Sequence, residues 1–137
     1  MTCELSILAE NTSVGEKIRF FRHSKMFSCE HLGKSVDLSG TTIHNYETGV
    51  LSPSLTMLKK IAFVFGIEPD KLYDDYYKFL DYPFSERIKL IREEHSLSQR
   101  ELARVFRTSQ TAIGSWEREE TVPTRKSWER FRELKLL

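Results

Sequence analysis

The strongest constraint on this chain is an internal repeat: residues 16–53 match residues 86–123 without a gap, at a constant offset of 70 positions. Ten positions are identical, and a further set is conservatively replaced. The identical pairs are Glu16/Glu86, Ile18/Ile88, Arg22/Arg92, Ser28/Ser98, Leu32/Leu102, Ser39/Ser109, Thr41/Thr111, Ile43/Ile113, Glu47/Glu117 and Pro53/Pro123. The conservative pairs are Lys17/Arg87, Arg19/Lys89, Gly33/Ala103 and Tyr46/Trp116. Such a register indicates the duplication of one small domain.

Within each copy, the stretch 98–117 or 28–47 has the pattern of two short helices joined by a tight turn. Ser98 and Glu101 have capping-box spacing, and Ser109 can cap the second helix. Ile113 and Trp116 fall on one side of that second helix. The other side receives small or polar residues, namely Gln110, Thr111, Gly114 and Ser115. A helix with an apolar back and a short, hydrogen-bonding front suits insertion into a DNA major groove.

The same signals, applied along the chain, predict an all-α protein. In the first copy we expect helices over 14–25, 29–36 and 40–47, a fourth from Ser54 to Phe65, and a fifth over 67–73. In the second copy we expect a first helix from Phe84, then 99–106, 110–117 and a last helix from about Thr124. The predicted division is a lead-in at 1–12, a first domain at 13–73, a linker or helix extension at 74–83 and a second domain at 84–137.

The connecting segment 73–84 is unusually aromatic for a linker. Its six rings are Tyr73, Tyr76, Tyr77, Phe79, Tyr82 and Phe84. Flexible linkers are rich in Gly, Ser or Pro instead. We therefore expect these rings to pack, either as a clamp or local core of the two domains, or as a dimer contact with a second copy or a partner protein.

Composition limits the remaining classes of function. The chain has 39% hydrophobic and 30% charged residues, which is typical of a globular protein. Residues 1–80 hold 9 Lys/Arg against 10 Asp/Glu, and residues 81–137 hold 12 against 10, so neither half is strongly basic. No apolar run approaches the roughly 20 residues of a membrane span, and no signal-peptide pattern opens the chain. With only Cys3 and Cys29, we expect reduced thiols in a cytoplasmic protein.

No pattern of catalytic residues, metal ligands or cofactor-binding loops is present. His23, His31 and His95 lack metal-ligand spacing with either cysteine, so we expect surface histidines. The expected helices account for nearly all residues of each repeat. The sequence therefore predicts neither enzyme activity nor a cofactor.

Both copies resemble the helix-turn-helix domain of the Xre/Cro (lambda repressor-like) family. The shared pattern is Ile-x-x-x-Arg in a first helix, then S-x-x-x-L-[AG], then S-x-T-x-I-x-x-[YW]-E, then Pro and a fourth helix. Ser28–Pro53 and Ser98–Pro123 follow it throughout. The resemblance implies two tandem domains of four or five helices that bind double-stranded DNA.

The resemblance also assigns structural roles. It implies that Arg22 pairs with Glu47 and Arg92 with Glu117, to hold the helix orientation rather than to contact DNA. Two departures from the family pattern stand out. The turn position usually occupied by Gly is Asp37 or Arg107, and the second copy has Glu119 and Glu120 after its third helix.

The family's contact positions, carried over one by one, give a candidate DNA-binding set. Base contacts are expected from Gly40, Thr41, His44 and Asn45 in the first copy and from Gln110, Thr111 and Ser115 in the second, with Ser109 at the start of that helix. Phosphate contacts are expected from Thr42, Gln99, Arg118, Thr124, Arg125 and Lys126. Gln and Asn can each bind adenine through two hydrogen bonds.

These observations predict a sequence-specific transcription regulator, a repressor by family resemblance, with recognition helices at 39–47 and 109–117. The alternative is a protein-interaction module, antitoxin-like or partner-binding, in which only one repeat binds DNA. The near-neutral charge, Glu119–Glu120 and the aromatic segment favour that alternative.

Overall fold

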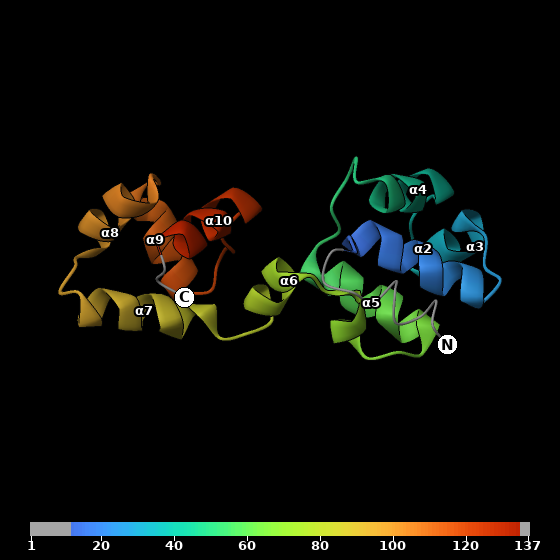
Figure 1. Ribbon diagram of the computed structural model, residues 1–137. Coiled ribbons are helices and arrows are strands. Elements are labelled where there is room, and N and C mark those ends of the chain that lie inside the picture. Colours follow the sequence, from blue (N-terminus) through green and yellow to red (C-terminus); the bar gives the residue numbers. More distant parts are fainter. Residues whose placement is uncertain (1–11, 135–137) are drawn as a thin grey trace. The chain divides into compact units, whose positions relative to one another are not determined.

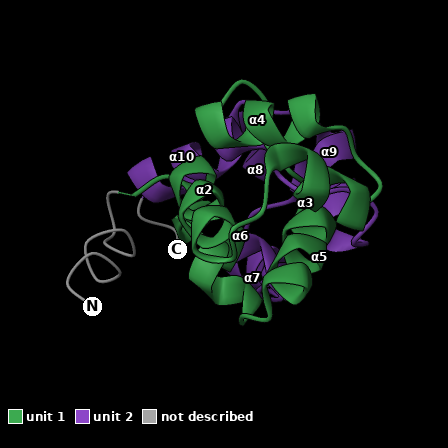
Figure 2. Ribbon diagram, turned by 90° about the vertical axis from the view of Figure 1, so that its right-hand side faces the viewer, with its two compact units in different colours: residues 1–78 green, residues 79–137 purple. Residues whose placement is uncertain are grey.

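A computed structural model describes residues 12–134, and every regular element in that range is helical (Figure 1). The chain divides into two compact units between Lys78 and Phe79, coloured separately in Figure 2. We call them the first unit and the second unit. The predicted all-α fold is confirmed. Cys3 and nearly all of the expected 1–12 lead-in lie outside the described residues.

The two units repeat the same succession of helices. The first unit contains α2 (Val14–Ser24), α3 (Cys29–Ser35), α4 (Gly40–Thr48), α5 (Leu55–Phe65) and the 3₁₀ helix η1 (Pro69–Leu72). Helix α6 (Asp75–Leu80) runs across the division between the units. The second unit contains α7 (Phe84–Glu94), α8 (Gln99–Phe106), α9 (Gln110–Glu117) and α10 (Arg125–Glu133). All four helices of the second unit begin 70 positions after their counterparts in the first.

Helix starts follow the capping residues that the sequence predicts. Ser13 with Glu16 and Ser98 with Glu101 form complete capping boxes, each satisfying two backbone N–H groups that a helix start leaves unpaired. Ser28, Ser39, Ser54, Ser109 and Thr124 each accept a hydrogen bond from the backbone N–H three residues on. Pro83 breaks the pattern, because it offers no side-chain cap to α7.

Left-handed backbone recurs at the same positions in both units. The pairs, with their φ angles, are Met26/Ser96 (60° and 53°), Asp37/Arg107 (60° and 55°) and Gly49/Glu119 (84° and 61°). Non-glycine residues take this conformation at a cost. Five of these six are not glycine, so the surrounding helix packing imposes the turns.

Each unit buries one face of every helix in its own core. In the first unit α4 packs against α2 and α3 (Figure 1). Ile18, Leu32 and Ile43, one from each of these helices, are completely buried. In the second unit α9 packs against α7 and α8 in the same way. Trp116 of α9 lies edge-on to Phe131 of α10, with ring centroids 5.8 Å apart, and closes that core.

The aromatic segment contributes to the cores of both units. Tyr73, Tyr76 and Tyr77 are buried; Tyr73 stacks on Tyr77 with a centroid distance of 6.2 Å, and Tyr76 meets Tyr77 edge-on at 5.3 Å. Phe79 packs with Phe84 and Phe131 of the second unit, at 5.7 and 5.9 Å. These rings therefore belong to local cores, as one of the two interpretations of this segment proposed.

The predicted fifth helix over 67–73 is present but shorter than expected. Only Pro69–Leu72 is helical there, and it is a single 3₁₀ turn. Pro69 fits the start of a helix because it needs no N–H partner. The turn ends where the Tyr73 backbone becomes extended and its carbonyl accepts a hydrogen bond from the buried Lys17 amine, at 2.8 Å.

Gly15 allows the first helix of the first unit to approach the end of α4 very closely. A Cβ atom at Gly15 would lie 2.5 Å from the Glu47 carbonyl oxygen and would also collide with that of Tyr46. The second unit has Ser85 at the equivalent position, with its hydroxyl donating to Glu119 at 2.9 Å. The two units therefore space the first and third helices differently.

We expect Gly15→Ala to destabilise the chain by about 1–3 kcal/mol, because α2 and α4 must separate to admit the methyl group. Helix propensity alone would predict the opposite change in stability, because alanine is a better helix former than glycine. Urea unfolding followed by circular dichroism measures the change. Arg19→Ala, on the exposed side of the same helix, is the matched control and should stay within about 0.5 kcal/mol. A stabilised Gly15→Ala variant would contradict this packing.

Candidate nucleic-acid interface

A buried ion pair holds each recognition helix against the first helix of its unit. Arg22 Nε and Nη2 donate to the two Glu47 carboxylate oxygens at 2.6 and 3.0 Å. Arg92 donates twice to one oxygen of Glu117, at 3.1 and 2.7 Å. Each guanidinium also donates to the backbone carbonyl five residues on, Phe27 or Leu97. The pairing that the family resemblance implies is thus present in both units.

The two pairs differ in burial and in their third partner. Side-chain exposure is 10% and 5% for Arg22 and Glu47, but 25% and 3% for Arg92 and Glu117. In the second unit Gln99 Nε2 donates to Glu117 at 2.7 Å. In the first unit the equivalent residue, Cys29, makes only a 3.8 Å contact from its thiol to Glu47. The Gln99 amide, expected at a phosphate, is thus already engaged in orienting Glu117.

Two pKa shifts in the first unit follow from this arrangement. The hydrogen bond to Glu47 raises the pKa of Arg22 above its ordinary value. Burial raises the pKa of the Cys29 thiol, and the negative charge of Glu47 raises it further. Cys29 is a free cysteine, and it remains a thiol that can donate to Glu47 at neutral pH.

Fewer residues are exposed on the outer face of α9 than the sequence predicts. Ser109 caps the helix, and Gln110 and Thr111 are exposed at its start, as expected. Ser115 is only 9% exposed, and its hydroxyl lies 2.7 Å from that of Thr121. Gly114 is also buried, because the Arg118 guanidinium covers it. Ser115 therefore does not present its side chain on the open face, and only the first turn of α9 does so.

The front of α4 has a different chemistry. Thr41 and His44 are exposed, while Thr42 and Asn45 are half-buried. The Thr42 hydroxyl lies 2.9 Å from that of the N-cap Ser39. At Gly40, α4 approaches the start of α3 closely, since a Cβ there would lie 3.0 Å from the Glu30 amide nitrogen. Gly40 thus permits close helix packing, and Thr41, His44 and Asn45 form the open face.

Arg118, an expected phosphate contact, has an acidic partner within the chain. Its guanidinium donates to both carboxylate oxygens of Glu120, at 2.9 and 3.2 Å. This bond raises the pKa of Arg118 and lowers that of Glu120 from their ordinary values. Both side chains are 58% exposed. Glu119 instead accepts a hydrogen bond from Ser85, so the two carboxylates have different roles.

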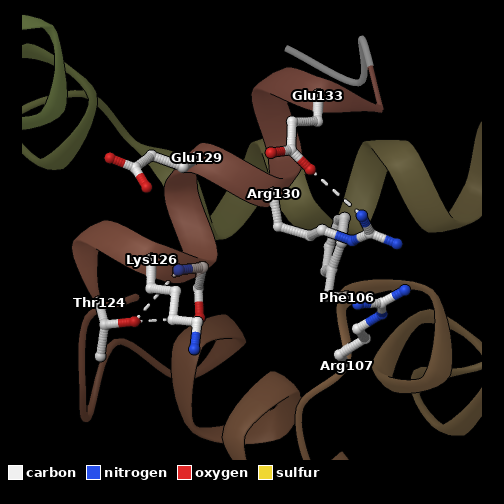
Figure 3. A pocket seen from close by; sticks show the side chains of 8 residues that line it. Phe106, Arg107, Thr124, Lys126, Glu129, Arg130 and Glu133 are labelled. Atoms are coloured by element: carbon white, nitrogen blue, oxygen red, sulfur yellow. Dashed lines mark hydrogen bonds and ion pairs between the residues drawn. The ribbon is translucent and has the colours of Figure 1, made fainter.

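The start of α10 lies beside a hollow of about 460 Å³ in the second unit (Figure 3). Thr124 caps the helix, Lys126 is exposed in its first turn, and that turn contains no acidic residue. Arg107, expected only as a turn residue, lines the same hollow from the end of α8. Arg107 has a left-handed backbone conformation, with φ of 55°. Its turn position is the only sequence signal that singles it out.

Between residues 12 and 134, no helix combines the length and apolarity needed to cross a membrane. Over the same range, no three His, Cys, Asp or Glu side chains gather where a metal ion could bind.

We expect Arg92→Met to destabilise the second unit by about 3 kcal/mol, because Glu117 would keep a buried charge without its partner. Both tryptophans of the chain, Trp116 and Trp128, are buried in this unit. Tryptophan fluorescence in a urea titration therefore measures its unfolding directly. Arg87→Met, an exposed change on the same helix, is the control and should change stability by less than about 0.5 kcal/mol. Equal stability of the two variants would contradict a holding role for the pair.

Comparison with known protein families supports what the geometry indicates. A helix-turn-helix family model matches the chain twice, over residues 19–72 and 88–131. These segments contain both Arg–Glu pairs, both recognition helices and the starts of α5 and α10. Neither the curated proteins nor the solved structures yielded a match. The chain belongs to the Xre/lambda repressor-like helix-turn-helix family of DNA-binding transcription regulators, and it carries two tandem copies of the domain.

Proposed function

We propose that this protein is a sequence-specific repressor that binds double-stranded DNA through α4 and α9. The observation that carries the proposal is the first turn of α9, where Gln110 and Thr111 are exposed while Ile113 and Trp116 fix the back of the helix in the core. A glutamine at the start of a recognition helix can form two hydrogen bonds with adenine in the major groove. Repression is inferred from the family resemblance.

The two units would bind unlike half-sites. The first unit offers Thr41, His44 and Asn45, whereas the second offers Gln110 and Thr111. Family members that bind as symmetric dimers present two copies of one recognition helix to a palindrome. One chain with two different helices would instead favour an asymmetric site. Selection from a random duplex pool tests this, and the proposal requires one bipartite site rather than a palindrome or no enrichment.

We expect Gln110→Ala and Asn45→Ala each to relax sequence preference in one half-site only, because each removes one amide that can contact a base edge. The expected loss of discrimination is about 1–3 kcal/mol at the affected base pair. Fluorescence anisotropy against a panel of single-base variants of the selected duplex measures it.

His95→Ala, a change at an exposed residue after α7, is the control and should leave every preference unchanged. If Gln110→Ala and Asn45→Ala both retain the wild-type preference at every base pair, α9 and α4 are not the recognition helices.

We expect Glu120→Gln to strengthen DNA binding severalfold, because Arg118 would lose its internal carboxylate partner and become available to a phosphate. The dependence of affinity on salt should become steeper by about one unit in a plot of log K against log salt. Glu86→Gln, an exposed change on α7 that removes the same charge, is the control. Equal gains from both variants would mean that net charge, not the release of Arg118, is responsible.

A second candidate function is protein binding by the first unit, with DNA binding confined to the second. It is favoured by Val50 and Leu51, which follow α4 and are 71% and 46% exposed. The equivalent residues of the second unit are Glu120 and Thr121. Affinity of a partner for an apolar surface should change little with salt, whereas DNA binding weakens steeply.

Self-association through residues 73–84 is the remaining proposal for partners. Tyr82 is 61% exposed there and could contact a second copy. Sedimentation at micromolar concentration tests this directly, and a clean monomer would rule it out.

A further inference from the structure

The two units carry very different charge around their recognition helices. In residues 98–126 the cations are Arg100, Arg104, Arg107, Arg118, Arg125 and Lys126. The residues at the same positions of the first unit are, in that order, Glu30, Lys34, Asp37, Thr48, Leu55 and Thr56. Five of the six positions therefore lose their positive charge in the first unit, and two of those five become acidic.

The acidic side chains of residues 98–126 offset only part of this positive charge. Apart from the buried Glu117, the second unit has three carboxylates there, against six cations. Glu101 accepts a hydrogen bond from the backbone of Ser98, Glu119 from Ser85, and Glu120 from Arg118. The first unit, apart from the buried Glu47, has Lys34 against Glu30 and Asp37. These two segments therefore carry net charge of opposite sign, and residues 98–126 should attract a polyanion more strongly than residues 28–56.

These cations of the second unit lie on α8, at the ends of α8 and α9, and in the first turn of α10. Arg100 and Arg104 are exposed four residues apart on α8, so they lie on one face of that helix. Arg107 and Lys126 line the hollow beside the start of α10 (Figure 3). Glu129 and Glu133 also line it, but Glu133 is paired with Arg130 at 3.2 Å.

The matching hollow of the first unit, about 480 Å³, has a different lining. Asp37 and Thr56 stand where the second unit has Arg107 and Lys126, and Lys59, Lys60 and the 86% exposed Phe63 lie beyond them. The two hollows therefore occupy the same position in the fold. Their lining residues differ in charge before the third helix and at the start of the fourth.

We propose that the second unit anchors this regulator to the DNA phosphates, and that the first unit contributes sequence reading with little electrostatic attraction. This inference rests on the proposed function, since it divides the labour of DNA binding between the units. Phosphate contacts by Lys and Arg release counterions, so they determine how steeply affinity falls with salt. The salt dependence of binding should accordingly come from the second unit.

The test exchanges exposed residues in the full chain. Arg100→Glu with Lys126→Thr places first-unit residues into the second unit and removes three units of positive charge. Lys34→Glu with Lys25→Thr removes the same charge from exposed positions of the first unit. Affinity for the selected duplex is measured by fluorescence anisotropy from 50 to 200 mM salt. Circular dichroism and tryptophan fluorescence establish that both variants fold.

The second-unit variant should weaken binding by about tenfold or more at low salt and reduce the slope of log K against log salt by about two. The first-unit variant should leave the slope within about half a unit of wild type. Equal loss of slope in both variants, or a larger loss in the first-unit variant, would overturn the inference. Failure of the wild-type chain to bind any duplex would instead refute the proposed function.

Discussion

The placement of each recognition helix depends on one buried arginine–glutamate pair. Glu47 and Glu117 each end the helix that faces outward, and Arg22 and Arg92 each come from the first helix of the unit. Their bonds join two elements 25 residues apart in the chain. Because a buried charge without a partner is costly, the pair strongly favours one orientation of α4 and α9. The apolar residues Ile43 and Ile113 then fix the same helices from within the core.

On this common frame the two units have diverged at the surface while keeping the backbone. Serine and threonine caps, left-handed turns and helix starts recur at one offset. Many side chains toward solvent differ. Of the six cations in residues 98–126, only Arg104 corresponds to a basic residue of the first unit, Lys34, and the positions equivalent to Arg118 and Glu120 are Thr48 and Val50. The core and cap residues that position the recognition helix were therefore kept after the duplication, whereas many exposed residues that could contact a ligand changed. Two tandem units with different exposed residues can make different contacts with the two halves of one DNA site.

Sequence patterns predicted the parts of this structure that are local. Capping serines, the glycines that end α4 and α5, and the repeated isoleucines depend on spacing alone, and they place most helix ends within a residue. The errors involve contacts between distant residues. Ser115 turns toward Thr121, the Gln99 amide binds Glu117, and Arg118 pairs with Glu120. Spacing cannot show which side chain a polar group will meet once the helices pack, and the 3₁₀ turn at Pro69–Leu72 likewise depends on its buried neighbours.

Duplex DNA is proposed to bind the outward faces of α4 and α9, which the buried pairs hold in place. Hydrogen–deuterium exchange of the full chain, with and without the selected duplex, tests it most directly. DNA binding should add protection in α4, in α9 and at the start of α10, and should leave the exposed end of α7 unchanged. Protection confined to segments outside both recognition helices, while the duplex is demonstrably bound, would contradict it.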